Sequence, residues 1–184
     1  MGPEQTCPFC REPLPDSNEE SVERRMKRIA ANDPVATCHQ GGIQYNKGDY
    51  VGAFEYYTKA AELGDVEAHY QLSIMYQYEE GVEKDEEKII HHLEEAAIGG
   101  HPNARYNLGC DEYSYGNVER AVKHWTIAAT QGHDASIKSL MLEFRDGNVS
   151  KEDLTRALRA HKAAVDATKS PQRETAEVFL RKNT

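Results

Sequence analysis

Two cysteines near the N-terminus are the residues of this chain best suited to metal chemistry. Cys7 and Cys10 are separated by two residues in the stretch CPFCREPLP. This spacing allows two thiolates to bind one metal ion, and Zn²⁺ is the usual occupant. A site that is short of ligands binds its metal weakly. Two free thiols in a flexible tail are therefore the alternative to a zinc site.

Other reactive residue types occur without the spacing that chelation or catalysis requires. Cys38 and His39 are neighbours in an expected helix, where adjacent side chains point about 100° apart. We therefore expect a buried cysteine beside an exposed histidine. His91 and His92 form no i, i+4 pair, and no Walker or dinucleotide-binding motif occurs. We expect no catalytic residues and a protein that is not an enzyme.

Composition and charge exclude several classes of partner. The chain has 22 Lys and Arg against 31 Asp and Glu, which gives a net charge of −9, whereas nucleic-acid binding depends on basic residues. No apolar run approaches the roughly 20 residues that span a membrane. The 4 cysteines lack a disulfide framework, which favours the cytoplasm or nucleus. The expected partner is a protein or peptide, and the acidic surface favours a basic one.

The elements that must position these residues repeat along the chain. Pairs of small residues recur at intervals of 36 and 32 residues. Periods of this length are typical of stacked helix pairs, in which each pair buries its apolar face only against its neighbours. The small positions are Ala60-Ala61, Ala96-Ala97, Ala128-Ala129 and Ala164-Val165.

When the repeats are aligned, two sets of equivalent positions, here called columns, distinguish a first helix, A, from a second helix, B. Helix A has a small residue followed four positions later by Leu, except that the first repeat has Gln40. These small residues are Ala36, Ala68, Ala104 and Ser136. Helix B has a large ring or Leu three positions before its small pair, at Tyr57, Leu93, Trp125 and His161. Offsets of three, four and seven place each set on one helical face.

Capping signals agree with the columns and predict an all-α fold. Asp33-Pro34 and His101-Pro102 are helix starts, of which the histidine is the poorer cap. Four helix pairs are expected at about 34–63, 66–98, 102–131 and 134–167. A packing helix at 17–32 and a capping helix at 169–184 flank them. The predicted fold is an α-solenoid of about four stacked antiparallel helix pairs with these flanking helices.

One repeat carries a recognisable family pattern. It reads Leu72-Ser73-x-x-Tyr76, then Gly81-Val82-x-x-Asp85-x-x-Lys88, then Ala96-Ala97-x-x-Gly100 and Ala104. This resembles the SEL-one-like repeat, a relative of the tetratricopeptide repeat. The resemblance extends over about residues 30–167, and the repeat solenoid is expected at 33–168. It implies an α-solenoid that holds other proteins together as a scaffold or adaptor.

The cysteine pair has a resemblance of its own. Cys7-Pro-x-Cys10-Arg, followed by Pro-Leu, resembles the last ligand pair of a RING finger, the zinc domain that recruits ubiquitin-conjugating enzymes. A RING needs about eight ligands, and this chain has only that pair. We expect residues 1–16 to be a truncated, disordered RING-like remnant, with no zinc cofactor unless the upstream ligands are present. The alternative function is the substrate-recognition portion of a RING-type ubiquitin ligase.

A row of helix A side chains faces away from the predicted layer core. In this architecture the row lines the inner surface, where polar groups could hydrogen-bond the backbone of a bound peptide. Solvation without any partner is the alternative for each of them. The predicted groove residues are His39, Gln71, Asn107 and Ser139, then Glu67 and Asn103, with Tyr78 and Tyr113 adding aromatic surface.

Overall fold

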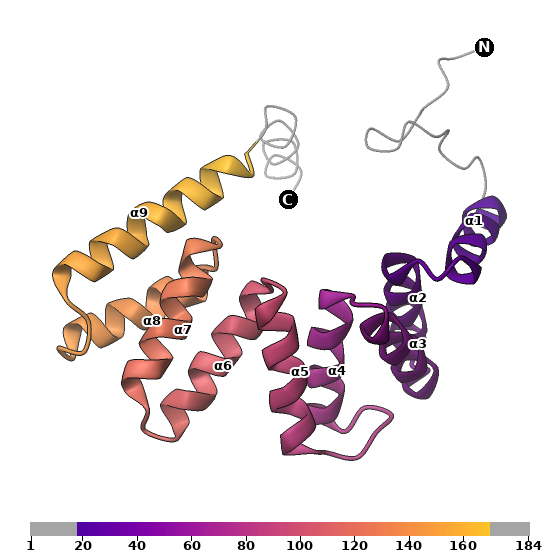
Figure 1. Cartoon of the computed structure of the whole chain (residues 1–184), viewed down its shortest axis with the longest axis horizontal. Coiled ribbons are helices and arrows are strands. Elements are labelled where there is room, and N and C mark those ends of the chain that lie inside the picture. Colours follow the sequence, from indigo (N-terminus) through magenta and orange to yellow (C-terminus); the bar gives the residue numbers. More distant parts are fainter. Residues whose placement is uncertain (1–17, 170–184) are drawn as a thin grey trace, which may run out of the picture. The chain divides into compact units, whose positions relative to one another are not determined.

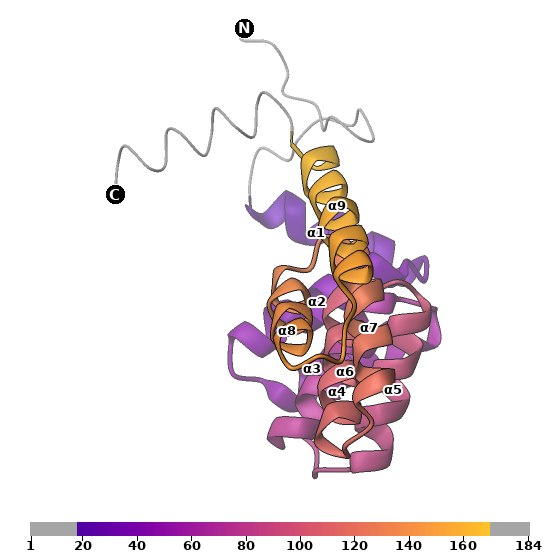
Figure 2. The ribbon, with the colours of Figure 1, turned by 90° about the vertical axis from the view of Figure 1, so that its left-hand side faces the viewer.

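The computed structural model describes residues 18–169, and every regular element in that range is an α-helix (Figures 1 and 2). Cys7, Cys10 and almost all of the expected C-terminal helix at 169–184 lie outside the described residues. None of the helices in the described range has the length and apolar character to cross a bilayer. The helices are α1 (Asn18–Ala30), α2 (Pro34–Asn46), α3 (Tyr50–Glu62), α4 (Val66–Tyr78), α5 (Glu86–Ile98), α6 (Pro102–Ser114), α7 (Val118–Thr130), α8 (Asp134–Arg145) and α9 (Lys151–Ala167).

The chain divides into two compact units, with the boundary between Lys84 and Asp85. Unit 1 contains α1 to α4, and unit 2 contains α5 to α9. The predicted pairs correspond to α2 with α3, α4 with α5, α6 with α7, and α8 with α9. The boundary therefore lies within the second predicted pair, between its A helix and its B helix.

The A helices begin at capping side chains, and Asp33 and His101 are the caps that the sequence predicts. Asp33 and Asp65 begin α2 and α4, where a carboxylate oxygen accepts from the backbone N–H three residues on at 3.0 and 2.8 Å. His101 and His133 do the same for α6 and α8 through Nδ1, both at 3.2 Å. Each cap satisfies a backbone donor that the first helical turn leaves unpaired. The A helices thus begin with aspartate in unit 1 and histidine in unit 2.

Unit 1 is built around the close pairing of α2 with α3, against which α4 packs. Leu72 and Met75 of α4 are completely buried in this core. Ala, not a larger residue, fills the positions where two helix backbones approach each other. The core residues are Cys38, Ala53, Tyr57, Ala60, Ala61, Ala68, Leu72 and Met75.

The loop after α4 folds back onto unit 1. Val82 packs against the core, and Glu80 accepts a hydrogen bond from the Tyr45 hydroxyl at 2.8 Å. Gly81 has φ +74°, and a Cβ there would lie 2.7 Å from the backbone of Tyr50. Only glycine fits that conformation and that approach. The Gly-Val pair of the family pattern therefore anchors this loop to the turn between α2 and α3.

Helix α1 contacts α2 and explains the one exception among the helix A columns. Arg25 of α1 donates to the Gln40 side-chain oxygen at 2.9 Å, so Gln40 has a polar neighbour where other repeats bury Leu. Of the apolar side chains of α1, Ile29 is buried, while Val22 and Met26 are exposed.

Unit 2 has a core of its own around α7. Helices α6 and α7 form its most extensive pair, and α7 also packs against α8 and α9. Trp125 lies at the centre of this core with only 4% of its surface exposed. The core residues are Ala121, Trp125, Ala129, Ile137, Leu140, Val149 and Ala157.

Glycines in helix A set how closely the two helices of a repeat approach. A Cβ at Gly41 would lie 2.8 Å from the Tyr57 ring, and one at Gly109 would lie 2.5 Å from Trp125 Nε1. The rings therefore lie directly against the α2 and α6 backbones. At the same position in α8 the chain has Met141, which is 53% exposed.

Candidate functional site

Three of the predicted groove residues surround one depression on unit 1. His39 projects from α2, and Glu67 and Gln71 project from the first two turns of α4. The depression has a volume of about 270 Å³. Its remaining lining residues are Cys38, Gly42, Ile43 and Asn46 of α2 and Tyr57 of α3.

The floor of the depression consists of two buried side chains that the sequence did not place there. Cys38 is 8% exposed and Tyr57 is 4% exposed, as expected for a core cysteine. A Cβ at Gly42 would lie 3.5 Å from the Tyr57 hydroxyl oxygen. Because Gly42 has no side chain, the space beside the Tyr57 hydroxyl stays open to the depression.

Carboxylates set the electrostatics of this depression. Burial raises the pKa of the Cys38 thiol well above its usual range, and the negative charges of Asp65 and Glu67 raise it further. Burial, the neighbouring Cys38 and Glu67 raise the pKa of Tyr57 to about 12. Gln71 Nε2 donates to Glu67 Oε1 at 2.6 Å. At neutral pH the floor is thus uncharged and the rim bears the Glu67 carboxylate.

The other predicted groove residues of the inner row lie on unit 2. Asn103 and Asn107 are on α6, and Ser139 is on α8. Asn103 is exposed, whereas Asn107 and Ser139 are half-buried. The Tyr106 hydroxyl interacts with the side chains of Ser139 and Cys110. Ser139 therefore supports a neighbouring tyrosine in addition to facing solvent.

The two predicted aromatic contributors differ in how firmly they are held. Tyr113 of α6 is 46% exposed, and its ring centroid lies 5.5 Å from that of Trp125. Tyr78 is the last residue of α4 and is 64% exposed. Tyr78 does not line the depression described above. Packing against Trp125 restricts Tyr113, so it is the better-ordered aromatic surface.

Candidate metal ligands do not cluster in the described part of the chain. Between residues 18 and 169, no three His, Cys, Asp or Glu side chains come together in a way that could hold a metal ion. The His91 and His92 rings lie 5.2 Å apart on α5. His92 is half-buried, as are Tyr56 and His124 at the same repeat position, so this position holds partly buried polar rings.

Comparison with known proteins identifies the repeat. The Sel1 repeat family model matches three consecutive segments, residues 35–65, 66–101 and 102–133, which together make up more than half of the chain. The chain belongs to the Sel1 repeat family. The predicted resemblance to SEL-one-like repeats is therefore confirmed. The Sel1 repeats correspond to α2 through α7, and the α8–α9 pair follows them.

Solved and curated relatives agree with this assignment. A Sel1 repeat protein from Oxalobacter formigenes is 27% identical, with a TM-score of 0.65 over 82% of this chain and 64% of that one. A protective antigen of uropathogenic Escherichia coli with an SLR fold has a TM-score of 0.60 at 20% identity over 83% of this chain and 34% of that one, which shows the fold alone. Chitin synthase regulatory factor 4 of Schizosaccharomyces pombe is 33% identical over 88 residues.

These likenesses establish the fold class and a general role. The described chain is an all-α repeat solenoid, as predicted. Sel1 repeat proteins generally serve as protein-interaction scaffolds, and the fold is typically non-catalytic. The chain spans 14% of the length of the fission-yeast relative and the match covers 47% of this chain. The RING-like pair, Cys7 and Cys10, lies outside both the matched repeats and the described residues.

Proposed function

We propose that this Sel1 repeat chain is a non-enzymatic adaptor whose unit 1 depression receives a basic side chain of a partner protein. The observation that carries the proposal is the convergence of His39, Glu67 and Gln71 from two helices on one depression. Its floor, formed by Cys38 and Tyr57, is uncharged at neutral pH. A carboxylate at the rim of an uncharged pocket favours a cationic guest.

The dimensions of the depression suit one long side chain. A volume of about 270 Å³ is below the range of roughly 300–1,000 Å³ that holds drug-sized ligands. Lys and Arg side chains combine an aliphatic stem with a charged head. The stem would lie on Ile43 and the Tyr57 ring, and the head would reach Glu67. Arg would also match a planar carboxylate with two parallel hydrogen bonds.

Charge over the whole chain supports the same class of partner. The net charge is −9, so a basic partner is attracted and an acidic one is repelled before contact. The fission-yeast relative is named a regulatory factor, and a regulatory role is consistent with an adaptor that positions other proteins. Asn103, Asn107 and Ser139 are the candidates for additional partner contacts on unit 2.

Short peptides test the depression directly. The probes are labelled peptides that carry one central Arg or, as the matched control, the uncharged isostere citrulline, and binding is followed by fluorescence polarisation. The Glu67→Gln variant should weaken Arg-peptide binding about tenfold, because hydrogen bonds to charged groups contribute roughly 1.5–3 kcal/mol. Glu62→Gln changes an exposed carboxylate outside the depression and should have no such effect. Equal binding of Arg and citrulline peptides would contradict the proposal.

Capture of a partner protein by two alanine variants tests which unit contributes more to binding. Gln71→Ala removes a side chain of the unit 1 depression, and Asn107→Ala removes one from unit 2. If the depression is the main site, Gln71→Ala should reduce capture of a partner more than Asn107→Ala does. A larger reduction from Asn107→Ala than from Gln71→Ala would show that the principal partner site is on unit 2.

The remaining alternative is a substrate-recognition portion of a RING-type ubiquitin ligase. It rests on Cys7 and Cys10 alone, and no described residue favours it. We propose that this chain holds no metal cofactor. Metal analysis of the purified chain should then find less than about 0.1 equivalent of zinc, because a site short of ligands binds weakly. About one equivalent of zinc per chain would instead support the RING-type ubiquitin ligase alternative.

A further inference from the structure

One buried hydroxyl in the floor of the unit 1 depression has no partner within the described chain. Tyr57 is 4% exposed, and no group between residues 18 and 169 forms a hydrogen bond with its hydroxyl. Buried polar groups in folded proteins are nearly always hydrogen-bonded. Because Tyr57 lines the depression, its unpaired hydroxyl indicates a hydrogen-bond partner that comes from outside the chain.

The first repeat is the one described repeat that combines this hydroxyl with an opening beside it. Six positions after the small residue of each A helix the chain has Gly42, Ile74, Cys110 and Leu142. A Cβ at Gly42 would lie 3.5 Å from the Tyr57 hydroxyl, so the larger side chains of the other repeats would cover it. The position of Tyr57 in the other B helices is taken by Leu93, Trp125 and His161. The other repeats therefore fold without this glycine and without a hydroxyl.

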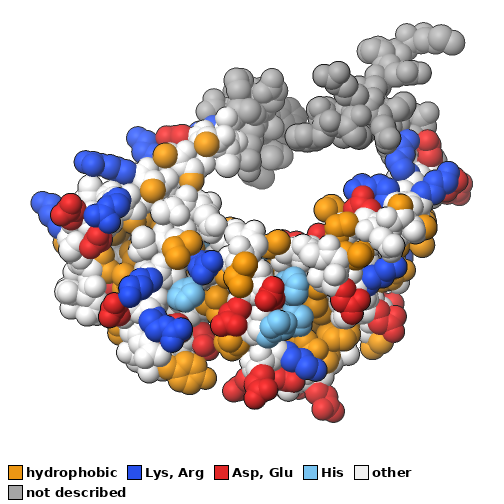
Figure 3. Space-filling view, viewed as in Figure 1, with side chains coloured by type: hydrophobic (Ala, Val, Ile, Leu, Met, Phe, Trp, Pro, Cys, Tyr) orange, Lys and Arg blue, Asp and Glu red, His pale blue; other side chains and the backbone are white. Residues whose placement is uncertain are grey.

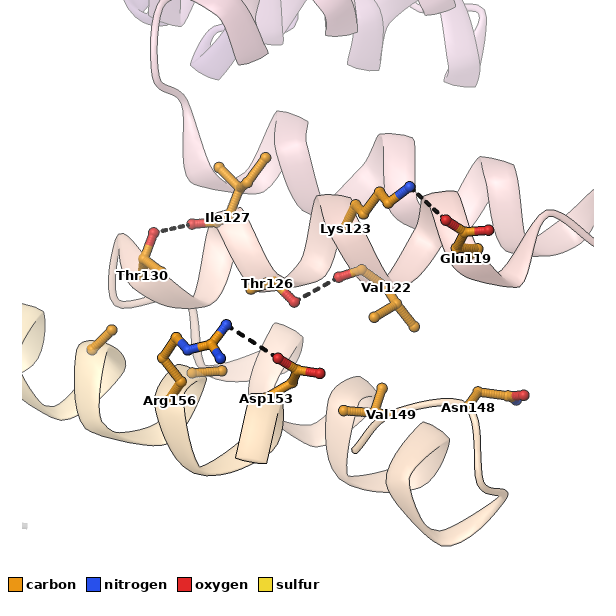
Figure 4. Close-up of a pocket in the computed structure, with 12 residues that line it drawn as sticks. Glu119, Val122, Lys123, Thr126, Ile127, Thr130, Asn148, Val149, Asp153 and Arg156 are labelled. Carbon is orange, nitrogen blue, oxygen red and sulfur yellow. Dashed lines mark hydrogen bonds and ion pairs between the residues drawn. The ribbon is translucent and has the colours of Figure 1, made fainter. Parts of the chain in front are cut away.

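The larger cavity on unit 2 offers no comparable group. It is a groove of about 750 Å³ between α7 and the first half of α9 (Figure 4). Thr126 and Thr130 in its lining donate to backbone carbonyls of their own helix at 2.8 and 2.7 Å. The charged side chains on its rims form ion pairs within their own helices, Glu119 with Lys123 and Asp153 with Arg156. These polar groups are already paired and indicate no particular ligand.

The Tyr57 hydroxyl lies where the head of a bound basic side chain is expected. The stem of the proposed guest lies on Ile43 and the Tyr57 ring, and the hydroxyl is at the tip of that ring. Burial, followed by the neighbouring Cys38 and Glu67, raises the pKa of Tyr57 to about 12. The phenol is therefore neutral at pH 7, and its oxygen can accept a hydrogen bond. A cationic head at this point meets a neutral acceptor in addition to the Glu67 carboxylate.

Arginine suits these two acceptors better than lysine does. A guanidinium presents its N–H donors along several edges of a rigid plane, so one edge can donate to Glu67 while another N–H donates to the Tyr57 oxygen. A lysine ammonium concentrates its donors at one point and is more strongly hydrated. It therefore loses more hydration on entering a floor that is almost completely buried. The depression should distinguish these two side chains although their charge is the same.

We propose that the Tyr57 hydroxyl makes the depression selective for arginine over lysine, by accepting a hydrogen bond from the guanidinium that Glu67 binds. This inference rests on the proposed function, because it concerns which basic side chain the depression prefers. Glu67 supplies the attraction for any cation, and Tyr57 determines the specificity.

Peptide selectivity of the full-length chain tests the role of the hydroxyl. Labelled peptides with one central Arg or one central Lys are compared by fluorescence polarisation. The wild-type chain should bind the Arg peptide about tenfold more tightly, which is the usual effect of one hydrogen bond to a charged group. Tyr57→Phe should weaken Arg binding about tenfold and leave Lys binding unchanged. Tyr56→Phe removes the hydroxyl of a half-buried tyrosine of α3 that does not line the depression, and it should keep the wild-type selectivity.

Unfolding measurements separate recognition by Tyr57 from a purely structural role. The hydroxyl has no partner in the described chain, so Tyr57→Phe breaks no hydrogen bond there. The urea concentration at its unfolding midpoint should therefore not decrease. Loss of arginine selectivity in a variant of unchanged stability would support direct contact with the guest. A Tyr57→Phe variant that keeps the wild-type preference for Arg would overturn the inference.

The same titrations distinguish failure of this inference from failure of the proposed function. Arg and Lys peptides that bind the wild-type chain equally, and that both bind Glu67→Gln more weakly, would retain the partner site and overturn its selectivity. Arg binding that Glu67→Gln does not change, or no binding of either peptide, would overturn both.

Discussion

At the scale of single residues, two adjacent glycines of α2 face different surroundings. A Cβ at Gly41 would meet the Tyr57 ring at 2.8 Å, whereas one at Gly42 would meet only the Tyr57 hydroxyl at 3.5 Å. Both residues are helical, so neither needs glycine for its backbone conformation. Gly41 is therefore required by packing, and Gly42 only keeps the floor of the depression open.

Alanine substitutions separate these two roles. Gly41→Ala should lower the free energy of unfolding by about 2 kcal/mol, since overpacking a core typically costs 1–3 kcal/mol. Gly42→Ala should raise it by about 0.5–1 kcal/mol, because alanine is the better helix former. Urea unfolding followed by circular dichroism measures both. Equal stability of the two variants would show that the Tyr57 ring can move away from α2.

The two described cysteines should differ in reactivity. Cys38 is buried, and burial together with Asp65 and Glu67 raises the pKa of its thiol. Cys110 is exposed. Because the thiolate is the reactive species, a disulfide reagent at pH 8 should modify Cys110 at least about 100-fold faster than Cys38. The experiment uses a Cys7→Ser, Cys10→Ser background, with Cys110→Ser as the control that leaves Cys38 alone. Rapid modification of Cys38 in that control would mean that the floor of the depression opens readily.

At the scale of elements, a histidine N-cap makes the stability of unit 2 sensitive to pH. In unit 1, hydrogen bonds from Arg28 and from the backbone N–H of Ala36 hold the pKa of the Asp33 cap below its ordinary value. His133 caps α8 through Nδ1, and that nitrogen accepts only while it is unprotonated. Burial lowers the pKa of His133 from its ordinary value of 6.5, with Asp134 opposing the shift and His161 and His101 adding to it.

The sign of the resulting pH dependence follows from this shift. A histidine whose pKa is lower in the folded state binds more protons when unfolded, so its contribution to stability is present above pH 6.5 and is lost as the pH falls. The urea concentration at the unfolding midpoint should therefore decrease as the pH is lowered from 7.5 to about 5.5. His133→Asn retains a capping side chain that does not titrate and should reduce the fall. His124, whose pKa burial also lowers, should account for part of the remainder. An identical pH profile in His133→Asn would exclude the cap as the cause.

At the scale of the whole molecule, charge selects the class of partner. The chain has a net charge of −9, whereas nucleic-acid binding depends on Lys and Arg side chains that neutralise phosphates and release their counterions. On the face shown in Figure 3, basic side chains are interspersed with acidic ones. Several of the basic side chains are paired within their own helices, as Lys123 is with Glu119 and Arg156 is with Asp153. From this charge distribution we expect protein partners and no nucleic-acid binding.

A duplex DNA of about 30 base pairs tests this exclusion. At 150 mM salt the chain should show no mobility shift up to about 100 μM, because even non-specific binders have dissociation constants of roughly 10⁻⁴–10⁻⁶ M. The Arg peptide proposed above is the positive control and should bind more weakly as salt rises. A DNA shift that weakens steeply with salt would place a basic surface on this chain and contradict the expectation.

The amino-acid sequence alone determined the repeat, the helix pairs and most of the caps, because these depend on signals within a few residues of one another. The alanine columns, the Asp33-Pro34 start and the Gly81-Val82 loop are local features with fixed offsets. The sequence also placed His39, Glu67 and Gln71 in the inner row. Their convergence on one depression did not follow from it, because that depends on how closely α2 and α4 approach α3.

Tertiary structure alone decided the floor of the depression and the groove beside α9. Tyr57 reaches the depression because Gly41 lets its ring lie against α2, a distance set across two helices. The groove of about 750 Å³ beside α9 is lined by side chains of α7, of α9 and of the loop that precedes α9, which the sequence does not show to be neighbours. Equivalent positions in the repeats predict which residues face inward. The volume of a cavity depends on how side chains from several helices pack against one another, and only the tertiary structure shows that packing.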